Sequence, residues 1–407
     1  MKKMAQFIAT ALLTCMIFSV TGCSAPKNET NDYSQQETVI GVAVYNTEDP
    51  EVLAFRNYFK NYLANCFHVS FLYSDSIRSA EDEQAFVKQA AQAGVQGIIS
   101  FISYDLENTV ALCEEEQIYY MMGSGTIADE AFEAMKNSPH FLGVIGPSET
   151  IERQAGSDMA TFFAKQDTEK NASYLIFTGG GSLGNVMHQY RTEAILTCLK
   201  EQYGLDCGQS VTRLALSDKP VVLSGQNMTV TLFPGYVSRP EVMTAAKEQI
   251  TDADYSFILS VMGLSELYDD IKAARKQQHA GLTMGVIDCF SEVNFNAVQD
   301  GYLRYVTGKY SSLVGPSFAA MYDAIHGNAV NYKKDGEAFQ LTQGFWTADN
   351  AKSYEQMYAY AVSDYLNAYS GDDLMSVMKL YTASATFADF RTLTEAYDIE
   401  SIQARRN

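Results

Sequence analysis

The feature that most constrains the fold is a repeated alternation of short apolar segments with amphipathic helical segments, which begins at Val39. The segments Val39–Tyr45, Phe141–Ile145 and Thr283–Ile287 are almost continuously apolar rather than alternating with polar residues. Strands of this kind are covered on both faces, which is typical of parallel sheets flanked by helices. The alternation restarts after Gly146-Pro147. The sequence therefore predicts an α/β protein with two doubly wound parallel sheets in tandem.

The expected elements have recognisable ends. Ser79 stands where a helix over Ala80–Ala93 needs an N-cap, Asp82 follows three residues later, and Gly94 ends the segment. A chain of 407 residues is also too long for one compact core, which agrees with two lobes.

The N-terminus is typical of an exported protein. Lys2 and Lys3 precede an apolar run over Phe7–Val20, which is too short for a stable membrane span. The run ends in Val20-Thr21-Gly22-Cys23, which resembles the lipobox of bacterial lipoproteins, where the Cys thiol receives diacylglycerol with acyl chains such as palmitate. We expect residues 1–22 to be a cleaved signal peptide and Cys23 to be the lipidated residue. An ordinary signal peptide with a coincidental cysteine is the alternative.

The segment behind Cys23 supports an anchor. Residues 23–38 are almost free of apolar side chains and are expected to form a flexible tether. Two acyl chains bury enough methylene groups to hold a protein at a membrane.

The charge of the chain excludes several classes of partner. It carries 49 acidic and 29 basic side chains, a formal net charge of −20. Such a charge repels nucleic acids and anionic membrane surfaces. The histidines and cysteines have no metal-ligand spacing, and no Ser lies in a G-x-S-x-G motif. We therefore expect no nucleic acid, no metal, no cofactor and no enzymatic activity. Whether Cys198 and Cys207 form a disulfide is left open.

Several short segments, in order along the chain, resemble the type I periplasmic binding proteins of the ribose- and galactose-binding group. They match the family's opening strand, its "gvdgIIl" segment, the Arg of its "R..GF" helix start, its "vGfD" strand end and its "i.dG.l" turn. The matching segments are Ile40–Val44, Ala93–Ser100, Tyr190–Ala194 with Arg191, Gly285–Asp288 and Val298–Leu303. The similarity extends over about Val39 to Asn331.

The resemblance implies two lobes joined by three crossing segments that act as a hinge. We place these near Gly146–Thr150, Cys289–Glu292 and Asp323–Asn331. Lobe 1 would then contain 39–147 and 290–325, and lobe 2 would contain 148–289 and 326–347. Two β-like runs within Val211–Phe233, VTRLAL and MTVTLF, predict an inserted hairpin. Residues 348–407 are expected to be a helical extension packed on the lobes.

Ligands of doubly wound sheets bind beyond the carboxyl ends of the strands. Residues just past the predicted strands are therefore the candidates for ligand contact. They are Tyr45, Asn46, Tyr104, Ser124, Arg191, Asp288, Phe290 and Lys309. Arg191 and Asp288 lie at positions that contact sugar hydroxyls in the family that the chain resembles.

The chain also departs from that family. Glu51 and Val52 stand where sugar binders have a pair of aromatic residues, and Met262-Gly263 replaces an Asn-Asp pair. Lys309 stands where a Gln is frequent. These differences put a simple pentose or hexose in doubt and leave a flatter or anionic ligand open.

One further motif permits a different function. Gly179–Gly184 spells G-x-G-x-x-G between an expected strand and an expected helix, as in dinucleotide-binding folds. The alternative is a glycine loop at the edge of lobe 2. No acidic residue ends a clear strand about 20 residues later, which favours the plain loop.

The sequence thus predicts a monomeric, lipid-anchored, extracytoplasmic protein that captures a small polar, sugar-like ligand for an ABC permease. A ligand-sensing lipoprotein that serves a membrane receptor kinase is the alternative among binding proteins. A dinucleotide-dependent enzyme that uses Gly179–Gly184 is the alternative of a different class.

Overall fold

The computed structural model describes residues 37–182, 184–277, 280–362 and 368–406. The predicted signal peptide, nearly all of the tether and Cys23 lie outside these residues. From Thr38 onward the described chain forms one compact unit that contains two sheets.

The first sheet has six strands in the order β12-β5-β4-β3-β1-β2, and all of its pairings are parallel. Its strands are β1 (Thr38–Val44), β2 (Val69–Ser76), β3 (Gly97–Ser100), β4 (Tyr119–Gly123), β5 (Phe141–Gly146) and β12 (Phe339–Thr342). As the continuous apolar runs predicted, β3 and β5 are buried along their whole length.

The second sheet has seven strands in the order β13-β11-β10-β9-β6-β8-β7. Its strands are β6 (Ser173–Thr178), β7 (Val221–Ser224), β8 (Thr229–Pro234), β9 (Phe257–Ser260), β10 (Thr283–Cys289), β11 (Leu303–Lys309) and β13 (Trp346–Ala348). The two edge strands, β7 and β13, are antiparallel to their neighbours, and the inner pairings are parallel. The predicted α/β class with two parallel-dominated sheets is confirmed.

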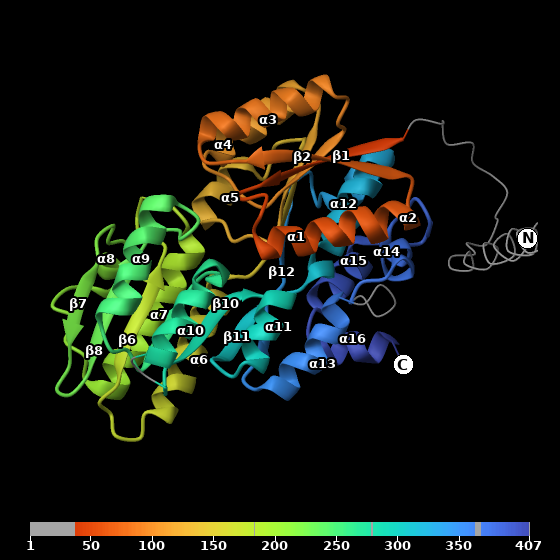
Figure 1. Cartoon of the computed structure of the whole chain (residues 1–407). Coiled ribbons are helices and arrows are strands. Elements are labelled where there is room, and N and C mark those ends of the chain that lie inside the picture. The colour runs from red at the N-terminus through yellow and green to blue at the C-terminus, as the bar shows by residue number, and fades with distance from the viewer. Residues whose placement is uncertain (1–36, 183, 278–279, 363–367, 407) are drawn as a thin grey trace, which may run out of the picture. The chain divides into compact units, whose positions relative to one another are not determined.

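Helices connect the strands and cover the sheets (Figure 1). Those of the two lobes are α1 (Pro50–Asn57), α2 (Ala64–Cys66), α3 (Ala80–Gln92), α4 (Leu106–Glu115), α5 (Asp129–Met135), α6 (Glu149–Gln166), α7 (Val186–Tyr203), α8 (Val211–Ala215), α9 (Pro240–Asp252), α10 (Tyr268–Gln277), α11 (Glu292–Gln299) and α12 (Gly315–Asp323). Helix α3 begins as predicted, because the Ser79 hydroxyl accepts a hydrogen bond from the Asp82 amide. Gly94 follows its end with a φ of 76°, a conformation that favours glycine.

The crossings between the sheets differ in part from the prediction. The first lies between β5 and α6, because β5 belongs to the first sheet and β6 to the second. The second lies after β11 rather than at Cys289–Glu292, because β11 pairs with β10 in the second sheet. The third lies between β12 and β13, because β12 pairs with β5 in the first sheet and β13 pairs with β11 in the second. The assignment of 290–309 to lobe 1, and of β12 to lobe 2, was therefore wrong.

The inserted hairpin is present, but its first arm is not the segment that was expected. Val211–Ala215 is the short helix α8, capped by the Ser210 side chain, and the hairpin consists of β7 and β8. Ser210 accepts from the Arg213 amide and so offers this segment a helical start, which its β-branched residues did not indicate.

The C-terminal extension is helical, as predicted. It contains α13 (Ala351–Val362), α14 (Gly371–Val377), α15 (Phe387–Glu395) and α16 (Ile399–Arg406). Helix α13 packs on α11 and β13, whereas α14 and α15 pack on α12 and β12. The extension therefore contacts elements of both lobes.

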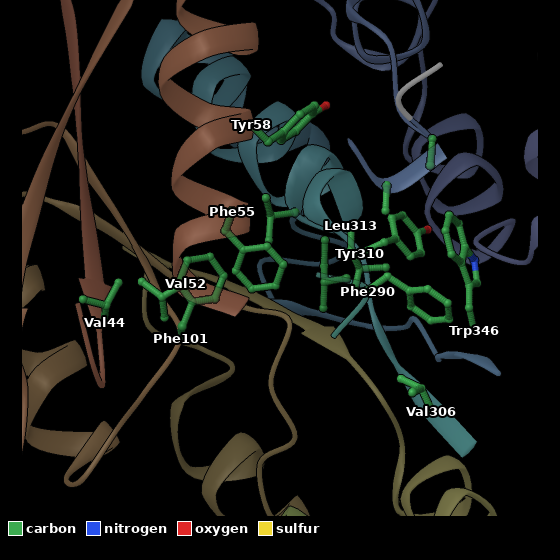
Figure 2. Packing of buried hydrophobic residues seen from close by; sticks show 14 of the residues in the cluster. Val44, Val52, Phe55, Tyr58, Phe101, Phe290, Val306, Tyr310, Leu313 and Trp346 are labelled. Carbon is green, nitrogen blue, oxygen red and sulfur yellow. The ribbon is translucent and has the colours of Figure 1, made fainter. Parts of the chain in front are cut away.

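One hydrophobic core continues from lobe 1 into lobe 2 and the extension. Figure 2 shows Val44 and Phe101 of lobe 1, Phe55 of α1, and Phe290 and Trp346 beyond them. The Trp346 ring stacks on Tyr310 with ring centroids 3.8 Å apart.

The described residues also settle two smaller questions. Cys198 and Cys207 are buried free thiols, so they do not form a disulfide. No helix in the described part of the chain is long and apolar enough to cross a bilayer.

Candidate ligand-binding site

The predicted site residues lie at the carboxyl ends of strands in both sheets. Tyr45 and Asn46 follow β1, and Ser124 follows β4. Asp288 is the second-to-last residue of β10, and Lys309 is the last residue of β11. Asp288 pairs with Gly308 and Cys289 pairs with Lys309, so the ends of β10 and β11 lie side by side.

An ion pair joins the two lobes at this edge. Glu51, in the first turn of α1, accepts from Lys309 with 3.0 Å between Oε1 and Nζ. Only 11% of the Glu51 side chain and 8% of the Lys309 side chain are exposed. Helix α1 begins here because Pro50 suits its first position and the Asp49 side chain accepts from the Glu51 amide at 2.8 Å. The start of α1 thus lies against the ends of β10 and β11.

Three carboxyl groups gather around this contact, and we call Asp49, Glu51 and Asp288 the carboxylate cluster. The Tyr45 hydroxyl donates to Asp49 at 3.0 Å, and the Asn294 amide donates to Asp288 at 2.7 Å. Burial, reinforced by the Glu51 charge, raises the pKa of Asp49 to about 6. Burial, reinforced by the Asp49 and Glu51 charges, raises the pKa of Asp288 to about 8. Among the described ion pairs, Lys309 is the only cation bonded to a member of the cluster, and its partner is Glu51.

Arg191, which was predicted to contact a ligand, bonds to groups of the protein itself. Its guanidinium forms a buried ion pair with Glu152 and donates from Nη1 to the Val261 carbonyl at 2.7 Å. Glu152 is fully buried and also accepts from Thr126 of lobe 1 at 3.2 Å. Arg191 therefore takes part in a network between the lobes, and its contact with a ligand stays a prediction.

Two buried polar atoms near the strand ends have no hydrogen-bond partner in the described structure. His188 is 7% exposed and its Nδ1 is unpartnered, and Ser124 is 3% exposed with an unpartnered hydroxyl. Burial and the nearby charges of Arg191 and Lys309 lower the pKa of His188 well below its ordinary value. Its ring is therefore a neutral imidazole at neutral pH, able to accept or donate a hydrogen bond.

Tyr104 lies on a loop that a buried glutamate holds in place. Glu83, which is 1% exposed, accepts from the Tyr104 amide at 2.8 Å and from the Ser103 hydroxyl at 3.3 Å. The Tyr104 ring is 36% exposed and feels the charge of Arg239, which follows β8 in lobe 2. The loop thus presents an accessible phenol toward the other lobe.

Two of the residues predicted to contact a ligand, Phe290 and Asn46, make contacts within the protein. Phe290 is 1% exposed, stacks on Tyr354 with centroids 4.8 Å apart, and meets Trp346 edge-on (Figure 2). Tyr354 of the extension thus covers one face of the ring, and contact of Phe290 with a ligand stays a prediction. Asn46 shapes the turn before α1, where its side chain accepts from the Glu48 amide at 3.1 Å.

The glycine loop after β6 is occupied by the chain's own carboxylate. The Ser182 amide donates to Asp218 at 2.8 Å, and a Cβ at Gly180 would lie 2.8 Å from the same oxygen. Backbone amides of Ser182 and Gly181 lower the pKa of Asp218, so an anion already holds the amides that a pyrophosphate would need. This arrangement disfavours the dinucleotide interpretation. Within the described residues, no group of three or more His, Cys, Asp or Glu side chains is suited to a metal ion.

Sequence reasoning missed three residues that the structure brings to this region, Asp49, Glu152 and His188, and it noted Glu51 only as a replacement for an aromatic residue. Asp49 and Glu51 flank the Pro at the start of a helix that follows a strand end, a position that could have marked them. Glu152 and His188 lie on helices, and no local pattern distinguishes them from other helical polar residues.

The architecture is the two-lobed fold of extracytoplasmic solute-binding proteins. An ABC transporter solute-binding protein from Bacillus halodurans C-125 with bound myo-inositol is 15% identical, has a TM-score of 0.56, and matches 80% of this chain and 99% of its own. A periplasmic solute-binding protein from Actinobacillus succinogenes 130z with bound D-allose is 10% identical, with a TM-score of 0.56 and coverage of 78% and 99%.

A third similar structure is the binding protein of an arabinose ABC transporter from Shewanella sp. ANA-3, with bound α- and β-L-arabinofuranose. It is 14% identical, has a TM-score of 0.52, and matches 80% of this chain and 96% of its own. The resemblance in fold to type I periplasmic binding proteins is thereby confirmed. No protein-family model matches the chain, and no curated protein matches it in sequence.

Proposed function

We propose that this protein is an extracytoplasmic solute-binding protein that captures a small polyhydroxylated ligand between its lobes and delivers it to an ABC permease. The observation that carries the proposal is the convergence of polar and charged groups from both lobes at the carboxyl ends of the strands. Asp49 and Glu51 come from lobe 1, and Asp288 and Lys309 come from lobe 2. Ligands of doubly wound folds bind at this edge.

The solved structures of the same fold support the ligand class. Those structures hold myo-inositol, D-allose and L-arabinofuranose, which are all small polyols or sugars. Tyr45, Tyr104, Asp288 and Lys309 offer hydroxyl, carboxylate and ammonium groups for such a ligand. We retain Ser124 and Arg191 as further candidate contacts.

We further propose that Cys23 carries a lipid that holds the protein at the outer face of the cell membrane. The support is the lipobox-like Val20-Thr21-Gly22-Cys23 and the polar segment that follows it. A monomer held by a flexible segment can bring its binding lobes to a permease in the same membrane.

A thermal-shift screen of sugars, inositols and other polyols, followed by calorimetric titration, tests the binding function. A ligand that binds only the folded state raises the melting temperature. Asp288→Ala should weaken binding by roughly 30- to 1,000-fold, because it removes a carboxyl group that would hydrogen-bond the ligand in a desolvated site.

Asp300→Ala is the matched control, since Asp300 is an acidic residue of the same lobe with a half-exposed side chain at 49%. It should bind like the wild type. Absence of binding across the whole screen would contradict the proposed function.

A further inference from the structure

The carboxylate cluster contains more acidic groups than the described ion pairs supply with cations. Glu51 is neutralised by Lys309, and Arg191 is already paired with Glu152. No described ion pair involves Asp49 or Asp288. Their hydrogen bonds come from neutral donors: the Tyr45 hydroxyl and the Glu51 amide for Asp49, and the Asn294 amide for Asp288. Two carboxyl groups, one from each lobe, thus lack a cation.

The geometry places these two groups together. Asp49 lies two residues before Glu51, whose partner Lys309 pairs in register with Cys289, the residue after Asp288. Helix α1 also packs directly against β10. The interaction between Asp49 and Asp288 is strong enough to be the largest charge effect on Asp288.

A second observation comes from His188, whose ring lies against Gly179 at the carboxyl end of β6 and near Lys309. His188 Nδ1 has no partner although the residue is more than nine-tenths buried, and the ring lies close enough to Lys309 to feel its charge. A neutral imidazole adds no positive charge to the site and can bond a ligand hydroxyl. The site thus combines unused hydrogen-bonding capacity with unneutralised negative charge.

We propose that the ligand is a cationic polyol, an amino sugar or aminocyclitol, whose ammonium group binds between Asp49 and Asp288. The proposal rests on the proposed function and specifies its ligand class. A hydroxyl can donate one hydrogen bond to a carboxylate but cannot neutralise it, whereas an ammonium group does both with three donors. A bare metal ion is a poorer occupant, because no described cluster has the three ligands it would need.

The proposal makes proton release a signature of binding. Burial and the Glu51 charge raise the pKa of Asp49 to about 6, and burial with the Asp49 and Glu51 charges raises that of Asp288 to about 8. An ammonium group favours the charged form of both, so binding at pH 7 should displace a proton from the cluster. The groups that face the two carboxyls are Tyr45, Glu51, Glu266, Tyr268, Cys289, Asn294 and Tyr354, with Lys309 bonded to Glu51.

The test uses matched pairs of probes: glucose and glucosamine, galactose and galactosamine, and myo-inositol with an amino-deoxy-inositol. N-acetylglucosamine serves as an uncharged control that retains the nitrogen. Titrations at pH 7 are run in phosphate and in Tris, whose different ionisation enthalpies reveal released protons. We expect at least one amine to bind about 30-fold more tightly than its neutral parent, with proton release, and N-acetylation to abolish this gain.

Variants then locate the effect. Asp49→Asn and Asp288→Asn should each reduce the preference for the amine at least 10-fold, whereas Asp300→Asn should leave it unchanged. A neutral parent that binds as tightly as its amine would overturn the proposal while leaving the proposed function intact. Failure of every probe, neutral and cationic, would overturn both.

Discussion

The ion pair between Glu51 and Lys309 allows a stringent test of how the two lobes are held together. Replacing Lys309 with Met keeps most of the side-chain volume but removes the only cation paired with Glu51 among the described ion pairs. Glu51 would then remain as a buried carboxylate with Asp49 and Asp288 nearby. We expect Lys309→Met to be strongly destabilising.

The magnitude follows from the geometry. At 3.0 Å between Nζ and Oε1, and with an effective dielectric constant of about 20, the attraction between the two charges is about 5–6 kcal/mol. Breaking a buried pair by removing one partner costs about 3–5 kcal/mol. We expect Lys309→Met to lower the free energy of unfolding by about 3–5 kcal/mol. The double variant Glu51→Gln/Lys309→Met should lie within about 1 kcal/mol of the wild type, because it leaves no unpaired charge.

Urea denaturation provides the assay. Trp346 is the one tryptophan in the sequence and lies in the shared core, so its fluorescence reports on the region where lobe 2 meets the extension. Circular dichroism measured in parallel shows whether both lobes unfold together. Lys272→Met is the control, since Lys272 and Asp300 form a half-exposed pair that should contribute less than about 1 kcal/mol. A loss below 1 kcal/mol in Lys309→Met, or additive losses in the double variant, would refute the reasoning.

The remaining predictions concern the extension, the cluster and the anchor. Asp323 is fully buried and accepts hydrogen bonds from the Lys379 amide at 3.0 Å and the Leu380 amide at 2.9 Å. Asp323→Ala should therefore lower the free energy of unfolding, measured by urea denaturation, by about 3 kcal/mol or more. An unchanged midpoint would contradict this role. Burial raises the pKa of Asp288 in the folded protein to about 8, so the folded state binds this proton more tightly than the unfolded state does. The free energy of unfolding should therefore fall as the pH rises from about 4 to about 8. Asp288→Asn should reduce that decline between pH 5 and pH 8, and equal declines in both proteins would argue against it. Cys23→Ser should move the protein from the membrane fraction to the soluble fraction, and continued membrane association without an acyl group would exclude the proposed anchor.

Local patterns in the sequence were sufficient to predict much of the architecture. Continuous apolar runs predicted buried parallel strands, and Ser79 with Gly94 predicted both ends of α3. Strand ends also marked Tyr45, Asp288 and Lys309 as candidate ligand contacts, which stays a prediction. These features depend on residues a few positions apart, and the physical causes, side-chain burial and capping, act over the same short range.

What the tertiary structure alone decided is which distant segments meet. The strand pattern of β11 and β12 is equally compatible with either sheet, and only pairing with β10 and β5 assigned them. In the same way, no local pattern indicated that Glu152, on another helix, forms an ion pair with Arg191. Lys309 finds Glu51 across 258 positions of sequence. Charges attract through space rather than along the chain, so the partner of a buried charge is settled only when the whole chain has folded.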